Sequence, residues 1–367
     1  MILGVDYYPA CTHPRGVGRY LRELVRALAS LEGGPELRLL DWGRGRRSLA
    51  ADQLGLDRAK VRIKRSSIRL PRKGLAAAGK LGLGADRLLG GCDWFLRAEP
   101  SWPPVGRART LAPVSELPAP GSASTGQAEA LGASLRRLDR CIVFSAEGER
   151  RLTGELGIAA QRVLRLPVGC DHWHRTDREP PAPAQQPVWL VLGGLRQDRE
   201  ALRILEAFET LHAEGLVREL RWIGPAGDAA EEFVRRVSFG AARAHIRWID
   251  TDEERRMPAH LAEASLLVHL SRDELTPVTP LEALRAGRGA VVSDLPAFRE
   301  TLGTLVDYAP PAGGRRGKDG LLEALRQGTA RSADPELTRA RVKLAQAYPW
   351  IGHARALLEA LGQGADS

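Results

Sequence analysis

The sequence of 367 residues contains no apolar run that approaches the roughly 20 residues of a membrane-spanning helix. Its first residues also lack a basic segment followed by a long apolar one, which is the pattern of a secretion signal. From these absences we expect a cytoplasmic protein, either free or held peripherally at the inner face of a membrane.

Cysteines and aromatic residues are scarce. The cysteines are far apart and form no C-x-x-C pair, so neither a zinc site nor a disulfide scaffold is suggested; they are Cys11, Cys92, Cys141 and Cys170. Aromatic residues make up 5% of the chain, and there is no zinc finger, RNA-recognition signature or interleaved basic and aromatic run. We therefore expect buried free thiols and no nucleic acid partner.

Acidic residues are outnumbered, with 45 Asp and Glu against 54 Lys and Arg, which gives a net charge of +9. This excess favours an anionic partner without identifying it. It is concentrated between residues 58 and 73, a segment that is rich in Lys and Arg and contains no acid. The segment is either a solvated face of the protein or an attachment to anionic lipid, at about 1 kcal/mol per basic residue.

Short apolar runs alternate with amphipathic stretches, the pattern of parallel sheets flanked by helices. We expect strands at 2–7, 36–42, 93–97, 109–114, 140–145, 188–194, 219–224, 245–250, 265–270 and 289–294. A proline-rich polar stretch before residue 188 favours a linker. The sequence thus predicts an α/β fold with two doubly wound domains at 1–175 and 188–347, a linker at 176–187 and a terminal helix in 348–367. Ligands of such sheets bind beyond the carboxyl ends of the strands.

Two glutamates, Glu274 and Glu282, follow the predicted strand 265–270 and are separated by seven residues. Glu274 is expected in the loop beyond the strand and Glu282 in the first turn of the next helix, so both can face one polyol ligand. Each glutamate also has a structural interpretation. Thr279, Pro280 and Glu282 fit a helix capping box, and Glu274 fits a solvated loop carboxylate.

This segment resembles that of the retaining GT-B glycosyltransferases of family 4 (glycosyl transferases group 1). Other segments resemble the same family in the same order: GVGRY with LRELVRALA from Gly16, FSAEGERRLTGELGI, RVLRLPVGCD, VWLVLGGLRQDRE and AYPWIGHARALLEAL. The resemblance covers nearly the whole chain. It implies two Rossmann-like domains facing a central cleft, a C-terminal helix crossing back to the first domain, and sugar transfer from a nucleotide-diphosphate sugar with retention of anomeric configuration.

The resemblance also implies roles for single residues. Glu274 would contact hydroxyls of the donor sugar as the catalytic carboxylate, and Glu282 would contact the ribose. Arg199, aided by the amides of Thr279 and Leu281, would stabilise the leaving diphosphate. The implied donor-binding positions are Gly16, Gly18, Arg196, Arg199, Glu274, Thr276, Val278, Thr279 and Glu282.

The expected cofactors and partners follow from the same comparison of residues. We expect no metal and no cofactor beyond the nucleotide-sugar co-substrate. The acceptor is expected to be a glycan, a lipid-linked molecule or a small molecule.

Several positions depart from the family pattern. Leu275-Thr276-Pro277 replaces Gly-Phe-Gly, and Gly194 stands where an arginine is usual. Ser115-Glu116 replaces His-Asp and Leu96 replaces a histidine, so Glu116 becomes the candidate acceptor-binding residue or catalytic base; His13 is interpreted as an unpaired loop histidine. These departures keep open two alternatives, a GT-B-like protein that binds a nucleotide-sugar or a partner enzyme without transfer, and a nucleotide-sugar epimerase. Glycoside hydrolysis is less favoured, because a glutamate in a first helical turn is stabilised as the anion.

Overall fold

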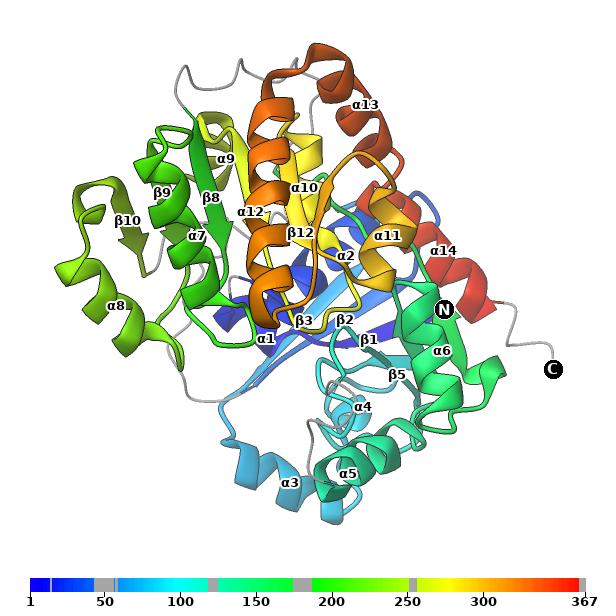
Figure 1. The fold of residues 1–367 in the computed structure, drawn as a ribbon. Helices are drawn as coiled ribbons and strands as arrows, with labels where there is room; N and C mark the ends of the chain where they lie inside the picture. Colours follow the sequence, from blue (N-terminus) through cyan, green and yellow to red (C-terminus); the bar gives the residue numbers. More distant parts are fainter. Residues whose placement is uncertain are drawn as a thin grey trace. The chain divides into compact units, whose positions relative to one another are not determined.

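The computed structural model describes residues 1–13, 15–42, 56, 59–117, 125–173, 187–250 and 256–362. The chain divides into two compact units, Met1–Pro167 with Trp350–Ser367, and Val168–Pro349. Each unit contains a parallel sheet with helices packed on it (Figure 1). The N-terminal stretch of the first unit ends at Pro167, whereas the predicted boundary is at 175. The predicted linker 176–187 lies outside the described residues except for its last residue.

The first unit contains a seven-stranded parallel sheet with the order β3-β2-β1-β4-β5-β6-β7. Its strands are β1 (Ile2–Asp6), β2 (Glu36–Trp42), β3 (Ile63–Ile68), β4 (Trp94–Leu96), β5 (Arg109–Pro113), β6 (Arg140–Val143) and β7 (Val163–Arg165). The central strands are largely buried, which explains why they appear in the sequence as apolar runs. The strand order reverses between β1 and β4, so the loops after these strands lie at the topological switch point.

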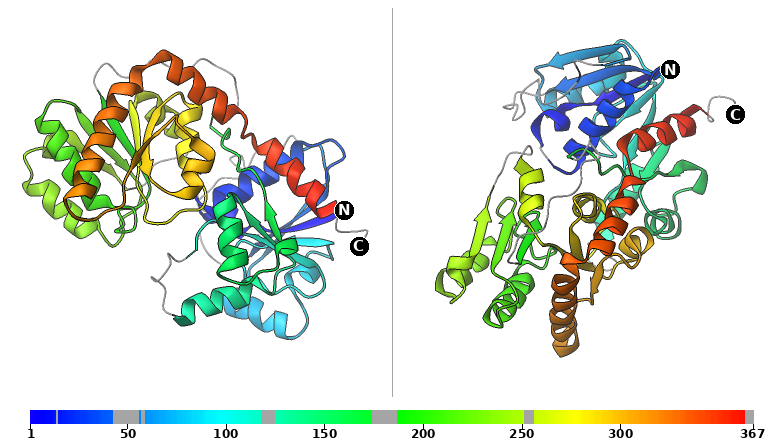
Figure 2. Two further views of the ribbon diagram at one scale, coloured as in Figure 1. Left: turned by 45° about the vertical axis from the view of Figure 1, so that its right-hand side comes forward. Right: turned by 90° about the horizontal axis from the view of Figure 1, so that it is seen from above.

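The helices of the first unit are α1 (Tyr8–Thr12), α2 (Val17–Ser30), α3 (Arg72–Lys80), α4 (Ala85–Leu88), α5 (Thr125–Leu135), α6 (Ala146–Gly154), the 3-10 turn η2 (Ala160–Arg162) and α14 (Trp350–Gly362). The terminal helix α14 packs beside α2 (Figure 2). Between them, the Tyr20 hydroxyl bonds to His353 Nε2 at 3.0 Å, and His353 Nδ1 donates to the Pro167 carbonyl at 2.6 Å. Chain segments far apart in the sequence thus complete one core.

The second unit contains a six-stranded parallel sheet with the order β10-β9-β8-β11-β12-β13. Its strands are β8 (Val188–Leu192), β9 (Glu219–Ile223), β10 (Ile246–Ile249), β11 (Leu266–His269), β12 (Gly289–Ser293) and β13 (Asp307–Ala309). Here the order reverses between β8 and β11, which pair directly through Leu266 and Leu267. The loops after β8 and β11 therefore flank the switch point of this unit.

The helices of the second unit are α7 (Ala201–Ala213), α8 (Ala230–Phe239), α9 (Met257–Glu263), α10 (Val278–Arg285), α11 (Pro296–Leu302), α12 (Gly314–Ala330) and α13 (Pro335–Gln346), with 3-10 turns η3 (Arg243–His245) and η5 (Arg331–Ala333). Helices α12 and α10 cover opposite faces of the sheet (Figure 1). One part of the core is made by large rings, with Trp222 and Phe233 at a centroid distance of 5.4 Å. The predicted α/β class with two Rossmann-like domains is confirmed, and the central cleft between them stays a prediction.

Three observed strands are missing from the predicted set, namely β3, β7 and β13. Strands β7 and β13 have only three residues each, too few to show a periodic pattern. Strand β3, with the sequence IKRSSI, forms an edge of its sheet and is only partly buried, so it carries little apolar signal. Within the basic segment 58–73, residues 63–68 form the edge strand β3 and residues 72–73 begin α3, whereas residue 58 lies outside the described residues.

Within the part of the chain that the structure describes, no helix has both the length and the apolar character of a membrane span.

Candidate functional site

Glu274 lies in the loop that follows the buried strand β11. The loop is anchored at its start, because the Ser271 amide donates to Ser293 Oγ at 2.9 Å and the Arg272 amide donates to the Asp198 carbonyl at 2.9 Å. The second bond joins the loop after β11 to the loop after β8. The Glu274 side chain is 8% exposed, so its interpretation as a solvated loop carboxylate is wrong.

The Glu274 carboxylate meets two side chains at this position. Its Oε2 accepts a charge-assisted hydrogen bond from Arg199 and lies 2.9 Å from His269 Nε2. Arg199 Nη1 is also 3.3 Å from His269 Nε2, so the three groups form one cluster. Burial raises the pKa of the Glu274 carboxyl, but the charges and hydrogen bonds of His269 and Arg199 outweigh it and lower the pKa to about 2. The carboxylate is therefore ionised at neutral pH.

His269 is a member of this cluster that the sequence analysis does not predict. It is the last residue of β11 and is 4% exposed. The sequence could have indicated His269 through its position, because it is a polar residue at the carboxyl end of a buried apolar strand, where ligands of such sheets bind. Arg199 reaches the cluster from the loop after β8. The cluster thus lies where the two loops at the switch point of the second unit meet.

Arg196, another of the predicted donor-binding residues, has a different partner. It forms an ion pair with Asp198 in its own loop, and its side chain is 53% exposed. The structure therefore brings Arg199 to Glu274 and pairs Arg196 within the loop.

Helix α10 does not begin with the predicted capping box. The helix starts at Val278, and its first backbone hydrogen bond runs from the Leu281 amide to the Pro277 carbonyl at 3.1 Å. Pro277 is therefore the N-cap, and no side chain caps the helix. Thr279 is consequently inside the first turn rather than at the N-cap. The Leu281 amide is already bonded within the helix, and its contribution to stabilising a diphosphate stays a prediction. The amides of Val278 and Thr279 remain in the first turn, where a helix offers no acceptor of its own.

Glu282, in the body of α10, is 1% exposed and lies 3.1 Å from His172 Nε2 through its Oε1. His172 is a second site residue that the sequence analysis does not predict. It belongs to residues 168–173, which are part of the second unit. Cys170 anchors this segment, since its amide donates to the Tyr348 carbonyl at 2.9 Å. The position of Glu282 in its helix could not predict His172 as its partner, because the two residues are far apart in the sequence.

Other predicted residues follow β11 or lie in the first unit. Thr276 is buried at 7% exposure, and Val278 is partly buried. Gly16 is the N-cap of α2 with φ 59°, and Gly18 lies against α1, where an added Cβ would be 2.2 Å from the His13 carbonyl. Glu116 is exposed in the loop after β5.

The remaining departures have structural explanations. Leu96, at the end of β4, is fully buried in the core. His13 bonds through Nδ1 to Thr12 Oγ1 at 2.9 Å, so the interpretation of His13 as unpaired is wrong.

No group of three or more His, Cys, Asp or Glu side chains that could hold a metal occurs among the described residues.

Solved structures identify the class of fold as GT-B. The lipopolysaccharide outer core galactosyltransferase WaaB, in its apo form, matches with 12% identity and a TM-score of 0.62, over 99% of each chain. Anabaena Alr3699/HepE in complex with UDP and glucose matches with 12% identity and a TM-score of 0.71, over 98% of this chain and 99% of its own. Sucrose-phosphate synthase from Thermosynechococcus elongatus matches with 16% identity and a TM-score of 0.72, over 99% of this chain and 98% of its own.

The family comparison is more specific for the second unit. Residues 174–308 match the family model described as Glycosyl transferases group 1. Comparison with curated protein sequences gives no significant match. The part of the chain that carries Arg199, His269, Glu274 and Glu282 is therefore similar to a glycosyl transferases group 1 domain.

Proposed function

We propose that this chain is a glycosyltransferase that moves a sugar from a nucleotide-diphosphate sugar to an acceptor. One observation carries the proposal: Glu274 is a buried, ionised carboxylate bonded to Arg199 and His269 at the switch point of the second unit. The family match over residues 174–308 supports the same class of reaction.

Sugar transfer requires acceptors for the hydroxyls of the donor sugar and positive charge for the leaving diphosphate. Glu274 suits the first task, because a carboxyl with a pKa of about 2 accepts hydrogen bonds and does not donate a proton at neutral pH. Arg199 suits the second, and a charge-assisted hydrogen bond contributes about 1.5–3 kcal/mol, or roughly ten- to hundredfold in rate. We infer a reaction without a metal and, from the resemblance to family 4, retention of anomeric configuration.

The remaining assignments belong to the same proposal. Glu282 is assigned to the ribose, which it can reach once its bond to His172 opens. Uridine diphosphate is the first nucleotide to test, because a similar solved structure is Anabaena Alr3699/HepE in complex with UDP-glucose. Glu116 is assigned to the acceptor side. The acceptor is a glycan, a lipid-linked molecule or a small molecule, and residues 58–73 are proposed to contact anionic lipid.

The proposal is tested by titrating the full chain with UDP-, GDP-, ADP- and dTDP-sugars in a thermal-shift assay, followed by transfer assays with radiolabelled donor. A ligand at a hundred times its dissociation constant stabilises the fold by roughly 2.7 kcal/mol. We expect one nucleotide-sugar to shift the unfolding midpoint and Glu274→Gln to reduce transfer at least about 100-fold. The matched control is Glu206→Gln, which changes a half-exposed glutamate on α7 that pairs with Lys318 of α12. No shift with any donor, or equal activity of Glu274→Gln and wild type, would reject the proposal.

A second candidate is a protein that binds a nucleotide-sugar without transferring it. The bond between His172 and Glu282 favours it, because it occupies the carboxylate assigned to the ribose. A midpoint shift with no transfer to glycan, lipid-linked or small acceptors would support this candidate. Conversion of the donor sugar without any acceptor would instead indicate an epimerase.

A further inference from the structure

The backbone of Glu200 has a left-handed conformation, with φ 51° and ψ 37°, at the N-cap of α7. Among the described residues, Glu200 is the one non-glycine residue with a positive φ. This conformation brings the Cβ of an L-residue too close to the backbone. It persists only where surrounding contacts hold it, and such residues cluster at functional sites.

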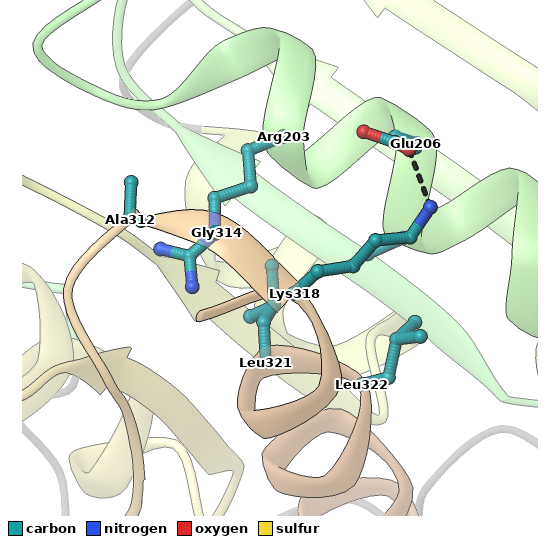
Figure 3. Close-up of a pocket in the computed structure, with 9 residues that line it drawn as sticks. Arg203, Glu206, Ala312, Gly314, Lys318, Leu321 and Leu322 are labelled. Carbon is teal, nitrogen blue, oxygen red and sulfur yellow. Dashed lines mark hydrogen bonds and ion pairs between the residues drawn. The ribbon is translucent and has the colours of Figure 1, made fainter. Parts of the chain in front are cut away.

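An ion pair supplies the contact that holds Glu200. Its side chain is 5% exposed and pairs with Arg203, which lies three residues further along α7. The Arg203 guanidinium also donates hydrogen bonds to the Pro310 carbonyl at 2.9 Å and to the Gly317 carbonyl at 2.8 Å. Figure 3 shows Arg203 extending from α7 toward Gly314 at the start of α12, beside a pocket of about 250 Å³. Arg203 thus fixes the N-cap of α7 to the segment after β13.

Glu200 directly follows Arg199, the cation of the Glu274 cluster. The turn before α7 is closed by backbone bonds from the Glu200 amide to Gln197 O at 3.1 Å and from the Ala201 amide to Arg196 O at 3.3 Å. With α7 and this turn fixed, the φ and ψ of Glu200 determine the direction in which the chain presents Arg199. In the observed conformation the Arg199 side chain reaches Glu274.

We propose that Glu200 and Arg203 are positioning residues for Arg199. Their ion pair holds residue 200 in the left-handed conformation and so directs the Arg199 guanidinium to Glu274. The inference rests on the proposed function, in which Arg199 stabilises the donor diphosphate, and it extends that function to two residues outside the cluster. Glycine adopts the left-handed conformation without a steric penalty. Glu200→Gly should therefore keep Arg199 in place without the ion pair.

Crystal structures of the unliganded variants test the geometry without any substrate. In Arg203→Gln and Glu200→Gln we expect residue 200 to leave the left-handed region and Arg199 to separate from Glu274. In Glu200→Gly and in the double variant Glu200→Gly with Arg203→Gln we expect both features to be kept. A retained φ and a retained Arg199–Glu274 contact in Arg203→Gln would overturn the proposal.

Calorimetric titration with UDP tests the consequence for binding. In the wild-type background we expect Arg203→Gln to weaken UDP binding about tenfold, which corresponds to the loss of one hydrogen bond to a charged group. In the Glu200→Gly background we expect the same substitution to weaken UDP binding less than about twofold. An equal loss in both backgrounds would show that Arg203 acts only by stabilising the Pro310 and Gly317 segment, and would overturn the proposal. Lys318→Gln, which removes the neighbouring ion pair between α12 and α7, is the matched control. A wild-type chain that binds no UDP counts against the proposed donor, and the crystal structures then decide the positioning inference alone.

Discussion

At the scale of single residues, the two glutamates of the candidate site differ in their surroundings. Glu274 is buried yet remains charged, because Arg199 and His269 together outweigh the cost of desolvation. Glu282 is buried and lies beside His172, which a distant segment contributes. Their spacing of seven residues is a property of the sequence, but two of the partners that define their chemistry, Arg199 and His172, are 75 and 110 positions away along the chain. A carboxylate's role therefore depends on residues that its own motif does not contain.

Gly18 provides a prediction at the same scale. An added Cβ would lie 2.2 Å from the His13 carbonyl and 2.5 Å from the Pro9 carbonyl, both of them backbone atoms that cannot yield easily. We expect Gly18→Ala to lower the free energy of unfolding by on the order of 1–3 kcal/mol through overpacking. Urea unfolding followed by circular dichroism measures the effect. Gly154→Ala is the control, because a Cβ there meets nothing within 4 Å and we expect little change.

At the scale of elements, α14 is held to α2 by a histidine that must stay neutral. Burial lowers the pKa of His353 from its ordinary 6.5 to about 4, against the smaller opposing effect of its hydrogen bond to Pro167. Between pH 6.5 and pH 4 the unfolded chain binds a proton at this site and the folded chain does not. The stability contributed by neutral His353 is therefore complete above pH 6.5 and is lost as the pH falls toward 4.

This linkage predicts a measurable pH dependence. The shift of His353 corresponds to roughly 3 kcal/mol, so we expect the thermal unfolding midpoint of the wild type to fall as the pH decreases from 7.5 to 4.5. His353→Gln should lower the midpoint at pH 7.5 and flatten this dependence. His13→Gln, which changes an exposed histidine of the same unit, should keep the wild-type slope. An unchanged slope in His353→Gln would contradict the assignment.

The basic segment 58–73 yields a second prediction about an element. Several of its cations are paired with acids, for example Lys60 with Glu32 and Arg65 with Asp41. Lys64, Arg69 and Lys73 are exposed on or after the edge strand β3. We expect the chain to co-sediment with vesicles that contain anionic lipid. Replacement of these three residues by glutamine should weaken binding by about 3 kcal/mol, at about 1 kcal/mol each.

A charge-matched variant controls this experiment. Glutamine at the exposed positions Arg243, Arg316 and Lys343 of the second unit removes the same charge from other surfaces. If binding reflects segment 58–73, only the first variant loses it, and raising the salt concentration weakens the wild type. Binding that is insensitive to salt, or an equal loss in both variants, would show that this segment is not the lipid contact.

At the scale of the whole molecule, two units repeat one architecture with different contents at their switch points. In the first unit, the segment after β1 and α1 carries Gly16 at the N-cap of α2 and Gly18 in its first turn, and β4 ends in the core residue Leu96. In the second unit, the corresponding loops bring together Arg199 and Glu274. The family match covers residues 174–308 and so falls on the unit with the charged cluster, whereas the GT-B likeness extends over nearly the whole chain. The two units thus share the geometry of a parallel sheet with a switch point, and the charged cluster of Arg199 and Glu274 lies in the second.

The sequence by itself determined the features that depend on neighbouring residues. Apolar runs predicted the buried strands, the alternation predicted two parallel sheets, and the spacing of Glu274 and Glu282 located the candidate site, because each is a local pattern. Only the tertiary structure decided where α10 begins, which cation reaches Glu274, and that His269 and His172 belong to the site. It also placed Glu200 in a left-handed conformation and paired its side chain with Arg203. Most of these features depend on groups that are distant in the sequence and that folding brings together, so no local pattern encodes them. His269, five residues before Glu274, is the exception, because its position at the end of a buried strand is visible in the sequence.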